Sequence, residues 1–478
     1  MIEGAQKLSI KEKIGYSLGD LAANLVFQTL MTYLAYFYTD IYGLSPNHAS
    51  AVMLTVGLIA AFGFNPIIGA IADRTVSKWG KFRPWILFTA IPLGIIALLA
   101  FSTPDFTYKG KVIYAVVTYT LLLLLYAANN LPYSALSGVI TGDMKERNSL
   151  SSYRFVAVMF AQFFVQVFML PIIETAGGGN KAVGIEKVMT WLAIIGTIML
   201  LITFFTTKER IVPTPEQKST LKEDLTDLFK NKPWVIMLVL TTLVFITLAM
   251  KGGSYVYYFK NYVDKESLTA LIKPILTFLS GIGINFFGED PVSAGFGLFN
   301  AGGIIFMIVG ITLSKRFADK YGKRDVFGIA LVISTLFILL FYFFASTSVG
   351  LMFVSQILHG FFYGITIPLL WAMIADVADY SEWKNNRRAT AIIFSAMMVG
   401  LKGGLSMGSA LLTWILGLFH YVPNSDAVQT ESAIHGTKML VSIFPSIPFL
   451  IGAALLFFYE INKKMEVQIE SDLKERRK

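Results

Sequence analysis

The chain has 478 residues, of which 55% are hydrophobic and 14% aromatic, and its formal net charge is +9. The apolar residues form long unbroken runs, which is typical of a polytopic helical membrane protein. Zero cysteines exclude disulfides, thiolate metal sites and cysteine nucleophiles, and four scattered histidines have no metal-ligand spacing. We therefore expect no metal and no cofactor. In a membrane protein the positions of Lys and Arg matter more than the net charge, and no nucleic acid partner is expected.

Runs of about 20 apolar residues predict about twelve spanning helices. The polar start MIEGAQKLSIKEK has no small-residue cleavage site, so the first helix is expected to remain in the mature protein. In chain order, the runs begin near Ile14, Ala49, Pro84, Val112, Ser152, Val188, Val235, Ser293, Val326, Gly350, Ala389 and Thr437.

Basic residues cluster in alternate loops, and this asymmetry predicts the orientation. The basic segments are 73–83, 143–147, 208–232, 314–324, 383–388 and the C-terminal tail. By the positive-inside rule, both termini and the central loop should be cytoplasmic.

The only long charged stretch divides the chain into two halves. We predict an N-terminal six-helix half at 1–207, a cytoplasmic linker at 208–233, a C-terminal six-helix half at 234–460 and a cytoplasmic tail at 461–478. Within the linker, Leu221, Leu225 and Leu228 have the spacing of an amphipathic helix on the membrane surface, although a solvated linker helix fits equally well.

An internal repeat crosses that linker. ADRTVSKWGKFR (72–83) follows the second helix and ADKYGKRD (318–325) follows the eighth. Each has an acid after a small residue, then basic residues around a glycine, which indicates a tight turn that clamps helix ends by charge pairs as the halves rock. We expect a gating role for these loops and for ADVADYSEWK at the end of the tenth helix, with the residues Asp73, Arg74, Asp319, Lys320, Asp376 and Asp379.

Three charged residues fall inside apolar runs. Lys402 stands near the middle of the run from about 389 to 418, and Lys251 precedes two glycines in LAMKGGSYVYYF. Asp20 is the only carboxylate that can be placed well within the helices of the first half. Such charges are costly at bilayer depth and normally face a protein interior or a cavity. Alternatively, Lys402 and Asp20 are structural partners of other charges, and Lys251 extends to an interface.

Several stretches resemble the glycoside-pentoside-hexuronide:cation symporter family, whose familiar member is melibiose permease and which belongs to the major facilitator superfamily. They are GYSLGDLAANL (15–25), YFYTDIYGL (36–44), NPIIGAIADR (65–74), WGKFRPWIL (79–87), NNLPYSAL (129–136), ADVADYSEWK (375–384) and HYVPN (420–424). The resemblance implies the all-α fold of that superfamily, a bacterial inner-membrane location and no enzyme activity.

The resemblance also implies roles for single residues. Lys402 matches a lysine of the eleventh helix near the cation and sugar sites. Trp371 matches a tenth-helix tryptophan beside the sugar cavity, and Arg154 matches an arginine of the fifth helix that can donate to hydroxyls or carboxylates.

Departures from melibiose permease are informative about the cation. Where its first, second and fourth helices have carboxylates, this chain has Asn24, Asn65 and Asn130, with Ala61 and Ser134 at two further positions. Sodium prefers several hard oxygen ligands, including carboxylates, so sodium coupling of that type is doubtful.

The buried charges suggest the substrate and the coupling ion. Two lysines with Arg154 face one reliable acid, so an anionic sugar such as a hexuronide would neutralise a surplus of positive charge, unless a lysine loses its proton instead. Asn24, Asn130 and Arg154 would hold hydroxyls, with Lys251 or Lys402 at the acidic group. Protonation changes at Asp20, Lys402 or His359 would couple import to a proton gradient, and Asn65 marks the altered cation site.

We therefore expect a proton-coupled sugar symporter, acting as a monomer in the lipid bilayer. An uncoupled facilitator and a lysolipid transporter of a related branch are the alternatives. A membrane-embedded enzyme would need an intramembrane nucleophile, base or metal cluster, and the sequence shows none. The outer stretch 264–290 fits a long loop with a short interfacial helix interrupted by Pro274.

Overall fold

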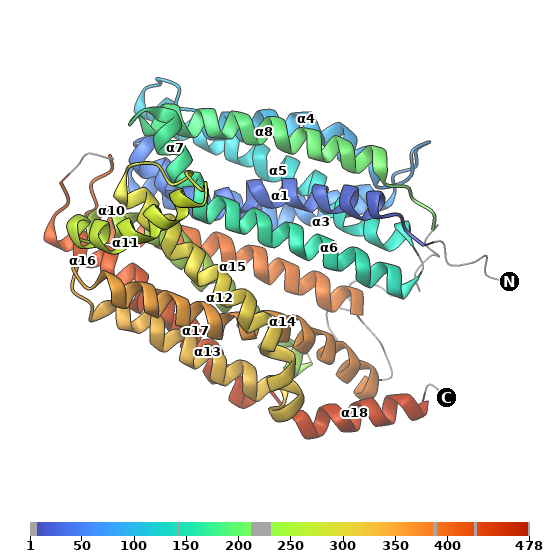
Figure 1. Cartoon of the computed structure of the whole chain (residues 1–478). Helices are drawn as coiled ribbons and strands as arrows, with labels where there is room; N and C mark the ends of the chain where they lie inside the picture. The colour runs from blue at the N-terminus through green and yellow to red at the C-terminus, as the bar shows by residue number, and fades with distance from the viewer. Residues whose placement is uncertain (1–6, 142, 212–230, 386–389, 425–427, 477–478) are drawn as a thin grey trace. The chain divides into compact units, whose positions relative to one another are not determined.

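The structure is a computed structural model that describes residues 7–141, 143–211, 231–385, 390–424 and 428–476. Within these ranges the chain is built of helices and contains no strand (Figure 1). Its contacts divide it into two compact units. Unit 1 comprises 1–216, 279–297 and 422–428, and unit 2 comprises 217–278, 298–421 and 429–478.

Unit 1 contains six long helical segments, three of them with a π-helical turn. These are α1 (Ile10–Tyr36) with η1 (Phe37–Ile41), then α2 (Pro46–Ile59), η2 (Ala60–Phe64) and α3 (Asn65–Asp73) in one run, α4 (Arg83–Ala100), α5 (Tyr108–Ile140), α6 (Met144–Phe163) with η3 (Phe164–Phe168) and α7 (Met169–Gly177), and α8 (Lys181–Thr206).

Unit 2 contains the remaining long helices and a C-terminal helix. These are α10 (Lys232–Asn261), α12 (Pro291–Tyr321), α13 (Lys323–Leu339) with η4 (Leu340–Tyr342), α14 (Val349–Asn385), α15 (Thr390–Leu418), α16 (Glu431–Val441) followed by α17 (Ile443–Leu455) and η5 (Leu456–Phe458), and α18 (Lys463–Arg476). The first residues of α12 fall in unit 1.

The number of spanning helices agrees with the sequence. Among the described residues, eleven helices are long and apolar enough to cross a membrane. The helix α1 is outside that group, yet its 27 residues are long enough to span a bilayer. It packs against α6 and α8 and buries most of its residues, so its polar side chains need not face lipid. The prediction of about twelve spanning helices is therefore confirmed.

The two units repeat one packing pattern. In unit 1, α1 packs against α6 and α8, and α4 packs against α5 and α8. In unit 2, α10 packs against α15 and α17, and α13 packs against α14 and α17. If the spanning helices are numbered from the start of each unit, the first packs against the fifth and sixth, and the third against the fourth and sixth, in both units. The repeat in the sequence therefore corresponds to a repeat in helix packing.

The stretch after α10 forms a helix of its own, α11 (Lys265–Gly281). It buries Leu268 and Ile272 and exposes Ile275 and Phe278, as an interfacial amphipathic helix does. Pro274 lies inside this helix without ending it. Of the central linker, Leu221, Leu225 and Leu228 lie outside the described residues.

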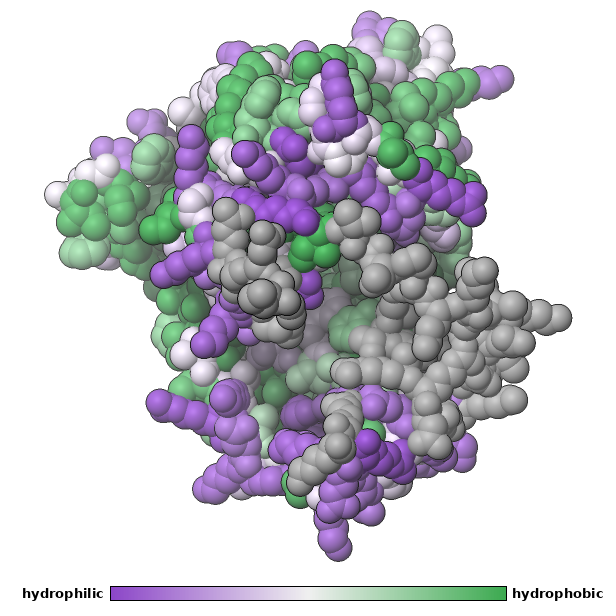
Figure 2. All heavy atoms as spheres, turned by 90° about the vertical axis from the view of Figure 1, so that its right-hand side faces the viewer, coloured by the Kyte–Doolittle hydropathy of each residue, from purple (hydrophilic) through white to green (hydrophobic). Residues whose placement is uncertain are grey.

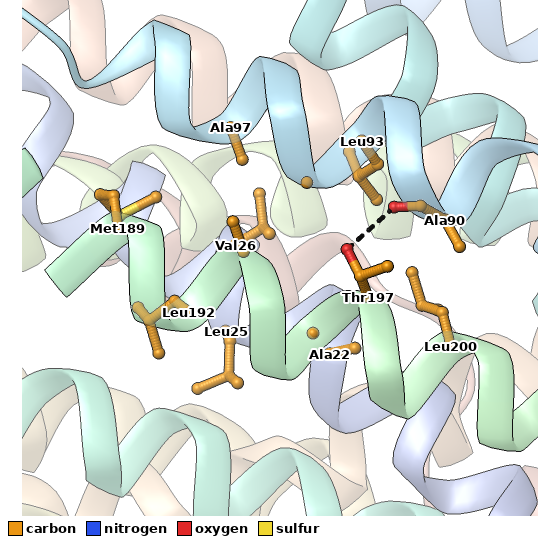
Figure 3. Close-up of a pocket in the computed structure, with 13 residues that line it drawn as sticks. Ala22, Leu25, Val26, Ala90, Leu93, Ala97, Met189, Leu192, Thr197 and Leu200 are labelled. Atoms are coloured by element: carbon orange, nitrogen blue, oxygen red, sulfur yellow. Dashed lines mark hydrogen bonds between the residues drawn. The ribbon is translucent and has the colours of Figure 1, made fainter. Parts of the chain in front are cut away.

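Small residues bring α4 and α8 close together beside α1. Gly94 and Ala97 of α4 face Ala193 and Gly196 of α8 around a gap of about 20 Å³ (Figure 3). The hydroxyl of Thr197 donates to the carbonyl oxygen of α4 at Ala90, 3.3 Å away, so one hydrogen bond links the two helices next to the gap. Close helix approach through small residues is the usual packing mode within bilayers.

The space around the two glycines of the gap predicts opposite effects of alanine substitution on stability. A methyl group at Gly196 would lie 3.9 Å from the Ala22 Cβ, an ordinary contact, whereas one at Gly94 would lie 2.5 Å from the Thr197 Oγ1. Gly196→Ala should raise the thermal unfolding temperature in detergent, because alanine favours the helix by about 1 kcal/mol. Gly94→Ala should lower it. An equal response of the two variants would contradict this account of the packing.

Candidate functional site

A polar cluster lies between α1 and α6 in unit 1, and we call it the α1–α6 cluster. It consists of Asp20, Asn24 and Arg154. Arg154 donates from Nε to Asp20 Oδ2 at 2.5 Å. The Asn24 amide nitrogen donates to Asp20 Oδ1 at 3.2 Å and to the Asp20 carbonyl oxygen at 2.9 Å. The structure thus brings together three residues that the sequence singled out separately.

The cluster contains one positive and one negative charge, and the two charged side chains differ in exposure. The Asp20 side chain is 4% exposed and that of Arg154 is 33% exposed. Asp20 lies ten residues into α1, or about 15 Å along its axis. At this depth an unpaired carboxylate would be costly in free energy, so Asp20 needs a partner that neutralises its charge. The guanidinium neutralises the carboxylate and keeps donors toward its exposed side.

Two tyrosines hold the cluster in place. The rings of Tyr16 in α1 and Tyr133 in α5 stack at 4.7 Å, and each hydroxyl donates to the backbone carbonyl of the other residue. The Arg154 guanidinium lies 5.7 Å from the centre of the Tyr133 ring, within the range of a cation–π contact. Three helices therefore fix the position of the arginine.

The other two asparagines that replace carboxylates are placed differently. The Asn65 amide nitrogen donates to the Ala60 carbonyl oxygen at 2.7 Å, where η2 interrupts the regular helix. Asn130 is half-buried on α5. Its neighbour Asn129 is 1% exposed and donates to the Thr89 hydroxyl at 2.7 Å. The structure thus places Asn24 in the α1–α6 cluster and gives Asn65 a backbone partner.

A second buried cluster lies between α10 and α14 in unit 2, and we call it the Lys251 cluster. It consists of Lys251, Tyr255, Gln356 and His359. The Lys251 ammonium and the Tyr255 hydroxyl both donate to Gln356 Oε1, at 3.3 and 3.2 Å. Lys251 is 8% exposed, so the structure excludes an extended position at a lipid interface. Within the described part of the chain it forms no ion pair with a carboxylate.

His359 completes this cluster one turn after Gln356. It is 3% exposed, and its Nδ1 lies 2.9 Å from the Ser334 hydroxyl and 3.1 Å from the Ser334 carbonyl oxygen on α13. Its ring also stacks on Tyr363 at 5.9 Å. His359 is therefore held by hydrogen bonds to α13 within this buried cluster.

Lys402 lies on the face of α15 that points away from α10. Gly400, Gly404 and Gly408 contact α10, and Lys402 is two residues, or about 200°, from the first of them. The side chain is half-buried, and Ser406 lies one turn later on the same face. Trp371 of α14 is half-buried too and packs against the core of unit 2.

The predicted gate loop of unit 1 is held by charge pairs within that unit. Asp73, at the end of α3, pairs with Lys81 at 3.0 Å, while Arg74 is exposed. Gly80 has φ +108°, a conformation that favours glycine. The Glu209 carboxylate accepts three backbone N–H groups of residues 81–83 at 2.7 to 2.9 Å, so it caps the start of α4.

The corresponding loop of unit 2 also contains a glycine with positive φ, but its helix end is capped by a cation instead of a carboxylate. Gly322 has φ +92°, and the Lys463 ammonium donates to the carbonyls of Asp319 and Lys320 at 2.8 Å, which caps the end of α12. In each unit the residue that caps the helix end, Glu209 or Lys463, comes from the segment after the last spanning helix. Figure 2 shows the hydrophilic side chains that gather around α18.

The acids of the tenth spanning helix join this network. Asp376 accepts from Lys323 at 2.5 Å, and Glu466 of α18 lies 3.9 Å from the same lysine. Partial burial raises the pKa of Glu466 above its usual value, and Lys323 opposes that change. Asp379 is half-buried one turn after Asp376. These contacts fix α18 against the end of α14 in unit 2.

Sequence reasoning missed three functional candidates. Asp40, in η1, is 4% exposed and accepts from the Thr39 hydroxyl at 2.7 Å, so a further buried carboxylate lies just beyond the end of α1. Its place in YFYTDIYGL, between aromatic residues, was the available signal. Gln356 and Glu209 gave no signal, because their partners are distant in the sequence.

Comparison with known proteins identifies the family. The family model described as MFS/sugar transport protein matches residues 15–297 and 286–463. The chain belongs to this family. It is 35% identical over 94% of its length to the inner membrane symporter YicJ of Escherichia coli, covering 92% of that protein. It is 33% identical over 97% of its length to the putative glycoside/cation symporter YagG of the same organism, covering 94% of it.

Solved structures support the fold of this MFS family member. The crystal structure of the nucleoside transporter NupG matches 94% of the chain and 99% of its own length, with a TM-score of 0.60 at 16% identity. At that identity the likeness shows the fold alone. The family match makes the chain a membrane transporter of the major facilitator type and not an enzyme, and its described residues form the all-α fold of that type.

Proposed function

We propose that this transporter imports a glycoside or hexuronide together with a proton, and that it prefers an anionic sugar. The name of the relative YagG, a putative glycoside/cation symporter, supports the substrate class and the coupling to a cation. The observation that carries the choice of cation is the α1–α6 cluster. Its one carboxylate, Asp20, is in contact with Arg154.

A sodium ion would find poor ligands in this cluster. The Asn24 amide nitrogen, a donor, points at the Asp20 carboxylate, and a guanidinium lies on its other oxygen. Sodium requires several oxygen atoms free of competing cations. A proton needs only one titratable group, and Asp20, Lys402 and His359 are the candidates in this proposal.

The preference for an anionic sugar is supported by the Lys251 cluster. Lys251 is buried, and its hydrogen-bond partner Gln356 is neutral. Arg154, by contrast, is balanced by Asp20. A carboxylate on the sugar would supply the missing negative charge. In the same proposal, Asn24, Asn130 and the exposed donors of Arg154 bind hydroxyls, Trp371 contacts the pyranose face, and Lys402 serves the coupling step.

The remaining parts of the proposal concern orientation and gating. The basic loops support a cytoplasmic location of both termini, in the inner membrane of a bacterium. The charge pairs Asp73–Lys81 and Lys323–Asp376 each lie at helix ends within one unit, and in this proposal they hold the loops that gate the cycle as the halves rock. A monomer contains both halves that such a cycle needs.

Uptake into proteoliposomes tests this function. A labelled glucuronide should accumulate under an imposed proton gradient and not under a sodium gradient, and a neutral disaccharide should accumulate less. Lys251→Gln should weaken glucuronide uptake about tenfold, as expected for a lost hydrogen bond to a charged group, and should spare the neutral sugar. Lys474→Gln, at an exposed position of α18, is the matched control.

Counterflow separates coupling from binding, because it requires no ion gradient. Lys402→Ala should abolish proton-driven accumulation while counterflow of the glucuronide persists. Sodium-driven accumulation of a neutral sugar that is unaffected by both lysine substitutions would refute the proposal. Equilibration without accumulation under either gradient would identify a facilitator instead.

A further inference from the structure

Two apolar grooves flank the exposed face of α13 in unit 2. The larger, of about 620 Å³, lies between α13 and α17 and is lined on the far side by Ala454 and Phe457. The smaller, of about 420 Å³, lies between α13 and the helices α12 and α14, with Phe317 on its wall. Ile329 and Ile333 line both grooves, so the exposed side of α13 forms a ridge between them.

Both grooves end at the first turn of α13, where a pair of charged residues lies. Asp325 lines both of them, and Arg324 lines the larger. Arg324 donates from Nε to Asp325 Oδ1 at 2.8 Å and from a terminal nitrogen to the Tyr459 carbonyl oxygen at 3.2 Å. Among the described residues these bonds use two of its five N–H donors. Donors of a partly exposed guanidinium therefore remain at the head of the grooves.

The backbone adds positive potential at this point. The helix α13 begins at Lys323, and its N-cap Gly322 provides no side-chain cap, so the first N–H groups of a 17-residue helix lie beside Arg324. Lys320 is exposed at the end of α12. Lys320 and Arg324 set two positive charges against the one carboxylate of Asp325, so charge complementarity favours an anionic group at the head and apolar chains below it.

The length of the grooves fits one leaflet of a bilayer. From Arg324 to Ile333 the helix advances nine residues, or about 14 Å. This distance is close to half of the roughly 30 Å hydrocarbon core. A ligand with one phosphate and two chains would place its phosphate at Arg324 and one chain on each side of the α13 ridge.

We propose that these grooves form a binding site for a single diacyl phospholipid. Arg324 binds the phosphate, and the two acyl chains lie one in each groove. The site is separate from the sugar and proton residues proposed above, and it would stabilise the packing of α13 between α12, α14 and α17. A ligand that lacks the phosphate or one chain loses one of the two halves of this recognition.

Native mass spectrometry of the detergent-purified full chain tests the site. We expect one dioleoylphosphatidylglycerol to stay bound per chain, and its lyso form and dioleoylglycerol to bind more weakly. Arg324→Gln should reduce the affinity for the phospholipid about tenfold, because a hydrogen bond to a charged phosphate is lost. Ala454→Phe, at an exposed position, should fill the larger groove and reduce binding without disturbing the core.

Two control variants have matched changes outside the grooves. Lys315→Gln removes an exposed cation of α12, and Leu351→Phe enlarges an exposed side chain of α14 that is 57% exposed. Neither should alter lipid binding. If Arg324→Gln and Ala454→Phe bind phosphatidylglycerol as the parent does, the grooves hold only exchangeable bilayer lipid and the proposal is overturned. Equal binding of dioleoylglycerol would also overturn it.

Discussion

Arg154→Ala is expected to abolish accumulation of substrate and to destabilise the protein by about 3 kcal/mol. The substitution removes the cation 2.5 Å from Asp20 and leaves a carboxylate that is 4% exposed without its counter-charge. Breaking a buried ion pair by removing one partner typically costs about 3–5 kcal/mol, and the lower end applies because the arginine is one-third exposed. Thermal unfolding in detergent and proteoliposome uptake measure the two effects.

A double-mutant cycle separates the pair from its surroundings. Asp20→Asn combined with Arg154→Gln removes both charges, so the double variant should be more stable than Arg154→Gln alone, although it should not accumulate substrate. Lys474→Ala provides a control, because its pair with Glu470 is exposed and screened by water and should contribute little to stability. If the effects of the two single substitutions simply add, the contact between Asp20 and Arg154 has no energetic role.

Gly404→Ala should be strongly destabilising, whereas alanine at the adjacent Gly403 should be tolerated. A methyl group at Gly404 would lie 2.5 Å from the carbonyl oxygen of Thr242 on α10, and backbone cannot move aside as a side-chain end can. At Gly403 it would meet no atom within 4 Å. Forcing the helices apart should cost about 1–3 kcal/mol. The melting temperatures of the two variants in the same detergent provide the measurement.

The neighbouring positions make this a controlled comparison. Both glycines follow Lys402 closely in one helix, so both substitutions change local helix propensity equally. Gly408 contacts the Ile246 carbonyl in the same way, and Gly408→Ala should resemble Gly404→Ala. A large effect at Gly403 with none at Gly404 would mean that α15 is rotated relative to α10 in the working protein.

The fold class follows from local features of the sequence. Long apolar runs determine where helices cross a bilayer, because every backbone polar group in lipid must be satisfied within its own helix. Several expected starts lie close to those observed, as at Val235 for α10 and Val326 for α13, whereas α6 and α8 begin well before Ser152 and Val188, at Met144 and Lys181. The charged turn repeated across the linker also indicated two similar halves. None of these inferences requires knowing which helix contacts which.

The candidate residues were recognisable for a related reason. A charge inside an apolar run is conspicuous in the sequence alone, and this marked Asp20, Lys251 and Lys402. The sequence did not show which residues these charges contact, although Asn24 and Arg154 were singled out on other grounds. Asp40 stands close to the end of its apolar run, so it was less conspicuous than these three charges.

The sequence by itself determined the membrane-spanning helices, their approximate number and the conspicuous charges within them. Only the tertiary structure decided that Asp20 contacts Arg154 and Asn24, that Lys251 contacts Gln356, and that Glu209 and Lys463 cap the gate loops. The Asp20–Arg154 contact joins residues 134 positions apart in the chain. Such contacts depend on the rotation of each helix about its axis and on which faces meet. Those are set by the packing of all helices together, through glycines such as Gly404, and not by the spacing of residues within one helix.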